Sequence, residues 1–171
     1  MDRSRVWAFI DDTRTVCDDC AERHGSSLTA RLERLDPDEI VEFAEHWREL
    51  DVAAYRWELW AAAYLLNGGC DDVCFEHFRA YVIGLGEEVY TRALEDPDSL
   101  VFLARAPGRQ FAHDAATLAS AAVDAYEHVT GCELPEVGPE LPEEPAGEEW
   151  DEERPELVTP RIAAAVGWLE A

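Results

Sequence analysis

Two groups of cysteine and histidine residues have the side-chain types and the spacing that metal binding needs. The patterns Cys-x2-Cys-x3-His and Cys-x3-Cys-x2-His each bring two thiols and an imidazole toward one face of a helix. Thiolate sulfur and imidazole nitrogen are the usual ligands of tetrahedral zinc. The candidate metal ligands are Cys17, Cys20, His24, Cys70, Cys74 and His77.

The same cysteines also fit a purely structural role. Cys17 and Cys20 fall on the apolar stripe of an expected helix, and free cysteine is among the most buried residue types. A Cys-x-x-Cys pair inside a helix also lacks the turn that zinc ribbons use. We therefore predict no cofactor, with zinc as the alternative hypothesis.

A second candidate site lies at the turn that runs from Gly68 to Arg79. Two acids, Asp71 and Asp72, follow the glycines of this turn. If the helix starts at Asp71 and Asp96 meet near Arg79, their carboxylates form a polar pocket for a cation or a basic ligand. Aromatic rings on the preceding helix would then be placed to stack on that ligand. The candidate binding residues are Asp71, Asp72, Arg79, Trp60 and Tyr64.

Architecture explains these residue types as well. Asp is a preferred N-cap residue and meets the positive end of the helix dipole. Aromatic residues at helical spacing, such as Trp60 and Tyr64, more often pack in a core than hold a ligand. The chain also lacks the nucleophile elbow, the phosphate-binding loop, the dinucleotide fingerprint and the His-Glu-x-x-His motif. The sequence therefore favours a role that is not enzymatic.

The charge of the chain limits its partners. The net charge is −24, from 38 acidic residues and 14 basic ones, and all of the basic residues are arginine. Such a chain is a poor partner for nucleic acid or for anionic membranes, because phosphate contacts need cations. No apolar stretch reaches the length of a membrane span. We expect a cytoplasmic protein with reduced thiols, since the cysteines number five and nothing suggests export.

Apolar residues recur at helical spacing along most of the chain and stop at glycine or proline. The pattern predicts a single compact multi-helix bundle, all-α, over residues 1–132. Residues 133–156 hold eleven acids and five prolines against one arginine, which predicts an extended linker. Residues 157–171 carry a short C-terminal helix that we expect to pack on the bundle, because it is too short to be stable alone. The expected helices cover residues 4–24, 27–35, 37–65 with a bend near Asp51, 72–89, 97–105, 114–130 and 160–169.

Four segments together carry a family resemblance. They are Trp60-Ala61-Ala62-Ala63-Tyr64, Gly68-Gly69-Cys70-Asp71-Asp72, Phe75-Glu76-His77-Phe78-Arg79 and Asp96-Pro97-Asp98-Ser99-Leu100. Over roughly residues 1–130 the chain resembles a bacterial family known as domain of unknown function 4240. The family usually places Ser, two acids and Gly after the cysteine, whereas this chain has Asp71, Asp72, Val73 and Cys74. The departure weakens any role that the acid pair would have.

The resemblance implies a compact helical domain and names no substrate. Such domains also occur beside tryptophan-glycine-arginine-type domains and near bacterial conflict genes, which implies an interaction role. We therefore predict an acidic protein-binding or regulatory domain, antitoxin-like or immunity-like toward a basic protein partner. The alternative is a metal-binding or small-molecule-binding domain, or an enzyme, with its site at the turn from Gly68 to Arg79.

Overall fold

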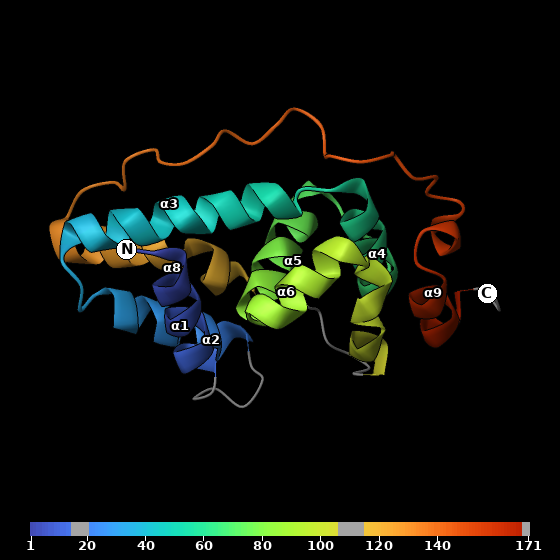
Figure 1. Cartoon of the computed structure of the whole chain (residues 1–171), viewed down its shortest axis with the longest axis horizontal. Helices are drawn as coiled ribbons and strands as arrows, with labels where there is room; N and C mark the ends of the chain where they lie inside the picture. The colour runs from blue at the N-terminus through green and yellow to red at the C-terminus, as the bar shows by residue number, and fades with distance from the viewer. Residues whose placement is uncertain (15–20, 106–114, 169–171) are drawn as a thin grey trace.

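The computed structural model describes residues 1–14, 21–105 and 115–168 of the chain. Within these ranges it contains helices and connecting segments but no strand, which confirms the all-α prediction. The helices share one hydrophobic core (Figure 1). The elements are α1 (Arg3–Arg14), α2 (Ala21–Leu32), α3 (Pro37–Ala54), α4 (Trp57–Asn67), α5 (Asp72–Gly84), α6 (Glu87–Glu95), the 3-10 helix η1 (Pro97–Arg105), α8 (Ala116–Thr130), the 3-10 helix η2 (Pro155–Leu157) and α9 (Pro160–Val166).

The longest helix, α3, runs along one side of the molecule (Figure 1). Helix α8 packs against α2, α3 and α5, while α4 contacts α5, η1 and α9. The largest fully buried side chains come from most of the elements of the bundle. They are Tyr90, Phe43, Phe75, Phe78, Ile10, Leu28, Leu32, Ile40, Leu50, Leu59, Ile83 and Leu100. Burial of these side chains supplies the main driving force for folding.

The helix that we predicted over residues 37–65 is divided into α3 and α4. The chain leaves the helix at Tyr55 and resumes it at Trp57, slightly beyond the bend predicted near Asp51. The break frees backbone groups that a continuous helix would use. The Tyr55 carbonyl accepts a hydrogen bond from Ala146 N at 2.9 Å, and Trp57 N donates to the Ala146 carbonyl at 2.9 Å. A distant part of the chain is therefore attached at this break.

Gly25 lies inside α2, although we predicted that it ends the first helix. A Cβ atom at this position would lie 2.3 Å from Thr117 Oγ1 and 2.7 Å from the backbone nitrogen of Leu118 on α8. The absence of a side chain thus allows the backbones of α2 and α8 to come close together. The expected helix over residues 4–24 corresponds to α1 and the beginning of α2, and residues 15–20 lie outside the described ranges.

Glycines also lie at other helix ends, and only some of these ends were predicted. Gly68 and Gly131 end α4 and α8 in the left-handed conformation, with φ of 72° and 69°. The helix predicted over residues 72–89 stops at Gly84, and α6 begins after Gly86, whose φ is 94°. Glycine accepts this backbone conformation without a Cβ penalty. Glycines therefore lie where several helices of the bundle end or begin.

Residues 133–154, which we call the acidic strap, run from the end of α8 along the length of the molecule to η2 and α9 (Figure 1). The strap is extended, as predicted, but it lies against the helices rather than free in solvent. Five of its apolar side chains are partly or fully buried, whereas all ten of its acidic side chains are exposed. The five are Leu134, Val137, Leu141, Pro145 and Trp150, and the remaining prolines of the strap and Ala146 are exposed.

Helix α9 docks on the bundle through Asp98 of η1. The Asp98 carboxylate accepts hydrogen bonds from the backbone nitrogens of Arg161 at 2.9 Å and of Ile162 at 2.8 Å. It therefore satisfies two free donors at the start of α9, as a capping residue does. Arg161 adds side-chain bonds to Asp98 and Asp96, and Ile162 is fully buried. Both ends of the strap are thus attached to ordered helices.

Candidate functional site

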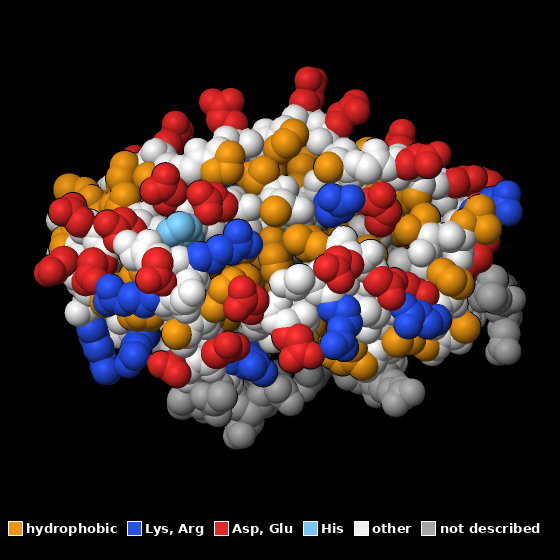
Figure 2. All heavy atoms as spheres, in the orientation of Figure 1, with side chains coloured by type: hydrophobic (Ala, Val, Ile, Leu, Met, Phe, Trp, Pro, Cys, Tyr) orange, Lys and Arg blue, Asp and Glu red, His pale blue; other side chains and the backbone are white. Residues whose placement is uncertain are grey.

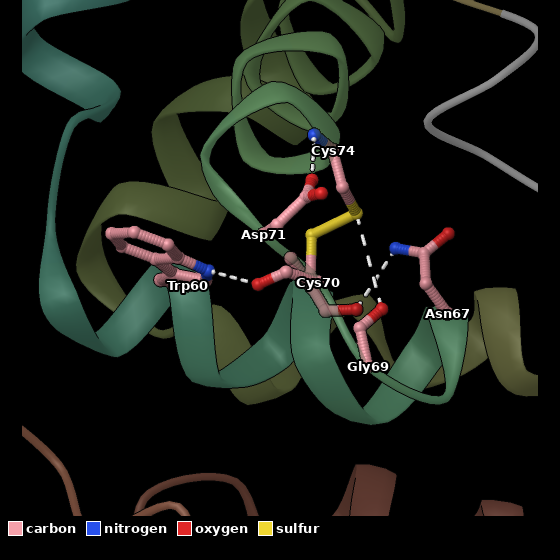
Figure 3. Close-up of a disulfide and its surroundings, with 7 residues drawn as sticks. Trp60, Asn67, Gly69, Cys70, Asp71 and Cys74 are labelled. Atoms are coloured by element: carbon pink, nitrogen blue, oxygen red, sulfur yellow. Dashed lines mark hydrogen bonds between the residues drawn. A yellow bond between two sulfur atoms is a disulfide. The ribbon is translucent and has the colours of Figure 1, made fainter.

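Cys70 and Cys74 form a disulfide at the start of α5 (Figure 3). The expectation of reduced thiols is therefore wrong for this pair. Cys70 precedes the N-cap residue and Cys74 lies in the first turn, so that their Cα atoms are 5.2 Å apart, within the range that a disulfide spans. In this form neither sulfur is a thiolate, and neither can ligate zinc.

The remaining predicted metal ligands do not join this pair. His24 is buried, and its Nε2 lies 3.0 Å from the Ile10 carbonyl and 3.0 Å from Thr13 Oγ1 on α1. His77 is half-buried on α5, while Cys17 and Cys20 lie outside the described residues. Within the described ranges, no cluster of three or more His, Cys, Asp or Glu residues is arranged to hold a metal ion.

Burial has an electrostatic consequence for His24. Loss of hydration lowers its pKa below the ordinary value of 6.5, and the hydrogen bond to Ile10 opposes this shift in part. Since the Ile10 carbonyl can only accept, Nε2 carries the proton of the neutral ring in this contact. His24 therefore acts as a neutral donor that joins α2 to α1.

The two acids of the candidate turn have different surroundings. Asp71 is the N-cap of α5, and its Oδ1 accepts a hydrogen bond from Cys74 N at 2.8 Å (Figure 3). Asp72 is exposed at the first position of the helix. Asp96, whose approach to this turn was the condition for a polar pocket, instead binds Arg161. The structure therefore does not bring the acid-capped helix starts together.

Arg79 is directed away from Asp71 and binds Asp51 of α3. Its Nε lies 2.7 Å from Asp51 Oδ1, and its Nη2 lies 3.3 Å from Asp51 Oδ2. The guanidinium also lies 4.9 Å from the ring centres of Tyr55 and Phe75. Only 3% of Arg79 and 8% of Asp51 is exposed, so this is a buried, two-pronged ion pair. Arg48 makes a further contact with Asp51 Oδ2 at 3.3 Å.

The two candidate aromatic residues contribute to packing. The Trp60 ring stacks on Phe75 at 4.7 Å, and its Nε1 donates to the Cys70 carbonyl at 2.8 Å. Tyr64 contacts Trp150 of the strap and Trp168 after α9, at ring-centre distances of 5.0 and 6.0 Å. Trp60 therefore supports the disulfide turn, while Tyr64 holds the C-terminal part of the chain.

A groove that we did not foresee lies between α3, α5, α8 and the strap. Its volume is about 610 Å³, which is in the usual range of binding pockets. The floor and walls combine small apolar side chains with charged ones. The lining residues are Ala44, Trp47, Arg48, Asp51, Glu76, Ala80, Ala119, Ala122, Val123 and residues 134–140. The apolar positions within the acidic segment, Leu134 and Val137, are the sequence signal that could have located it.

The surface carries charge of mostly one sign. Figure 2 shows acidic side chains projecting along the edge of the molecule that the strap follows in Figure 1. Apolar side chains appear between the charged ones on the visible face. No helix within the described residues is both long and apolar enough to cross a membrane.

Together these features define an all-helical domain with a groove bounded by a C-terminal acidic strap. The chain belongs to a family described as protein of unknown function (DUF4240), whose model matches residues 1–128. The strap and α9 lie beyond the matched residues. Neither the curated proteins nor the solved structures include a significant match to this chain.

Proposed function

We propose that this chain is a protein-binding domain that recognises a basic protein partner through the acidic strap. The observation that carries the proposal is the difference in exposure between the apolar and the acidic side chains of the strap. Five of its apolar side chains, from Leu134 to Trp150, are partly or fully buried, whereas its ten acidic side chains are all exposed. Among the described residues, none of these ten carboxylates forms an ion pair with an arginine. They are therefore available to a cationic surface.

The strap is held in place at several points along its length. Arg48 Nε donates to the Pro139 carbonyl at 3.2 Å, Ala146 pairs with the break between α3 and α4, and Trp150 packs on Tyr64. A segment that is already ordered loses less conformational freedom when it binds. The strap can therefore present its carboxylates with little ordering cost.

The charge pattern supports a role in partner choice and in the rate of encounter. An acidic surface attracts a basic partner over a distance of about 10 Å at ordinary ionic strength. Complementary charges raise the association rate and exclude partners of the same sign. An antitoxin-like or immunity-like role against a basic protein is one form of this proposal.

The alternative site at the turn from Gly68 to Arg79 has less support. Asp71 is occupied as a helix cap, and Arg79 is buried against Asp51. The disulfide also uses the sulfurs of Cys70 and Cys74. Zinc measured in protein purified without added metal, at a level near one ion per chain, would revive this hypothesis.

Binding of a labelled arginine- and lysine-rich peptide to the full chain tests the proposal, with fluorescence anisotropy as the readout. The strap variant changes Glu143, Glu144 and Glu148 to Gln. The control variant changes Glu22, Glu87 and Glu95 to Gln, three exposed acids outside the strap. Both variants have the same net charge, so the comparison separates the position of the charges from their number.

We expect the strap variant to lose about tenfold in affinity and the control variant less than about twofold, because nearby charges act most strongly. Affinity of the unmodified chain should also fall steeply as salt is raised. An equal loss in both variants would show that only net charge matters, and it would reject the strap as the recognition surface.

A further inference from the structure

The groove beside the strap has a floor of small side chains. Ala44 on α3, Ala80 on α5, and Ala119 and Ala122 on α8 all line it. Four alanines from three helices leave room where larger residues would fill the space between the helices. A volume of about 610 Å³ exceeds what one side chain needs, and it suits a short piece of extended chain.

Carboxylates line the groove without being neutralised. Glu76 of α5 and the strap residues Glu136 and Glu140 are exposed and line it. Among the described residues, none of the three forms an ion pair. Arg48, which also lines the groove, is occupied by Asp51 and the Pro139 carbonyl. The unpaired charge that lines the groove is therefore negative.

The chemistry of the lining residues suits an arginine side chain. Its apolar stem can lie along small apolar surfaces such as the alanine floor, and its planar head favours aromatic faces and carboxylates. Trp47 lines the groove and is half-buried. The fold already holds its own arginine in this way, since the Arg79 guanidinium lies 4.9 Å from the ring centres of Tyr55 and Phe75 and binds Asp51.

We propose that the groove between α3, α5, α8 and the strap binds an arginine-bearing extended segment of the basic partner. This inference rests on the proposed function and names the part of the partner that enters the protein. The arginine lies on the alanine floor beside Trp47, and its guanidinium reaches Glu76, Glu136 or Glu140. The strap then contributes one wall of the site as well as the long-range attraction.

Two groove variants of the full chain test the inference. Ala119→Leu fills the floor without changing charge, and its control is Ala53→Leu at an exposed position of α3 that does not line the groove. Glu76→Gln removes one lining carboxylate, and its control is Glu87→Gln on α6. The probes are three labelled peptides of one sequence with arginine, lysine or citrulline at the basic positions. Citrulline keeps the shape of arginine and removes its charge.

We expect Ala119→Leu to weaken binding of the arginine peptide about tenfold and Glu76→Gln about threefold or more, because each removes contacts of the bound side chain. The two controls should bind as the unmodified chain does. The arginine peptide should bind most tightly and the citrulline peptide least. If Ala119→Leu does not fold, Glu76→Gln against Glu87→Gln carries the test alone.

The outcomes separate this inference from the proposed function. If both groove variants bind as the unmodified chain does while the strap variant loses affinity, the groove proposal is rejected and recognition belongs to the strap alone. If the strap variant also binds normally, both proposals fail. Equal affinity for the arginine and lysine peptides would reject an arginine site.

Discussion

Asp51 and Arg79 form a buried ion pair that joins α3 to α5 with two hydrogen bonds, of 2.7 and 3.3 Å. The Arg79 guanidinium also contacts the aromatic rings of Tyr55 and Phe75, and Asp51 also contacts Arg48. Asp51 also lines the groove. A residue of the family-like segment around Phe75 thus fixes the position of the helix that forms one wall of the groove.

Removing one partner of this pair should be costly. We expect Arg79→Met to lower the free energy of unfolding by about 3 kcal/mol, because it leaves the Asp51 carboxylate buried with only Arg48 as a partner. The double variant Asp51→Leu with Arg79→Met should be less destabilised than the sum of the single variants. Urea unfolding followed by circular dichroism measures these differences. A loss below about 0.5 kcal/mol for Arg79→Met would mean that the pair contributes little.

The geometry of a helix explains why Arg79 does not join Asp71 in the polar pocket considered from the sequence. Asp71 and Arg79 are eight positions apart, so they lie about 12 Å apart along the axis of α5. The cap at one end therefore cannot reach the arginine two turns away. The true partner, Asp51, comes from a different helix, and no local pattern reveals such a contact. The sequence had indicated Asp51 only as the place of a bend.

Gly25 shows a second way in which a local rule can mislead. Glycine after a helical stretch usually marks a helix end, and the first helix was predicted on that basis. Here the lack of a side chain matters between two helices, because α8 passes against it. The helical periodicity itself was a sound guide, and the all-α class, the cap at Asp71, the helix end at Gly131 and a short helix after Asp96 could be read from the sequence. That this short helix is a 3-10 helix was not predicted.

Gly25→Ala should change the free energy of unfolding in the direction opposite to that usual for this substitution inside a helix. At an open position inside a helix this change stabilises a protein by about 1 kcal/mol. At the crossing of α2 and α8 the new Cβ atom would meet backbone atoms of Thr117 and Leu118, so we expect a loss of about 2 to 3 kcal/mol. Ser26→Ala, on the exposed side of the same helix, should change stability by less than about 0.5 kcal/mol. Stabilisation by Gly25→Ala would contradict the close crossing.

The roles of Asp71 and Asp72 can be separated by substitution. Asp71→Ala removes the side chain that accepts from Cys74 N, and it should cost about 1 kcal/mol of unfolding free energy. Asp72→Ala removes an exposed first-turn acid and should cost about 0.3 kcal/mol. Thermal unfolding of each variant measures the effect. A larger cost for Asp72→Ala than for Asp71→Ala would contradict the assignment of Asp71 as the cap. A loss of bound ligand without a loss of stability would indicate a site rather than a cap.

The disulfide closes only a short loop at the start of α5. Cys70→Ser together with Cys74→Ser should lower the free energy of unfolding by about 2 kcal/mol, the value that loop-closure entropy gives for so few residues. A reducing agent should lower the stability of the unmodified chain and leave that of the double variant unchanged. Intact mass before and after alkylation, without and with reduction, shows whether the pair is oxidised. Full alkylation of both cysteines in unreduced, unfolded protein would contradict the disulfide.

His24 should make stability depend on pH. Burial holds its pKa in the folded protein below the ordinary value of 6.5, so the unfolded chain takes up the proton first as the pH falls. The contribution of the neutral ring is complete above about pH 7 and is lost as the pH drops below the unfolded pKa toward the folded one. Urea unfolding at about pH 7.5 and about pH 5 measures this loss for the unmodified chain and for His24→Gln.

The comparison with His24→Gln is needed because many carboxylates also influence the acid response of so acidic a chain. Subtracting the two pH profiles removes their shared contribution and leaves that of the imidazole. We expect the unmodified chain to lose more stability than His24→Gln between these two pH values, since glutamine keeps a hydrogen-bonding group and cannot be protonated in this range. If the unfolding free energies of the two proteins depend on pH in the same way, His24 has the same pKa in the folded and unfolded states. The proposed pH dependence of stability from His24 would then be rejected.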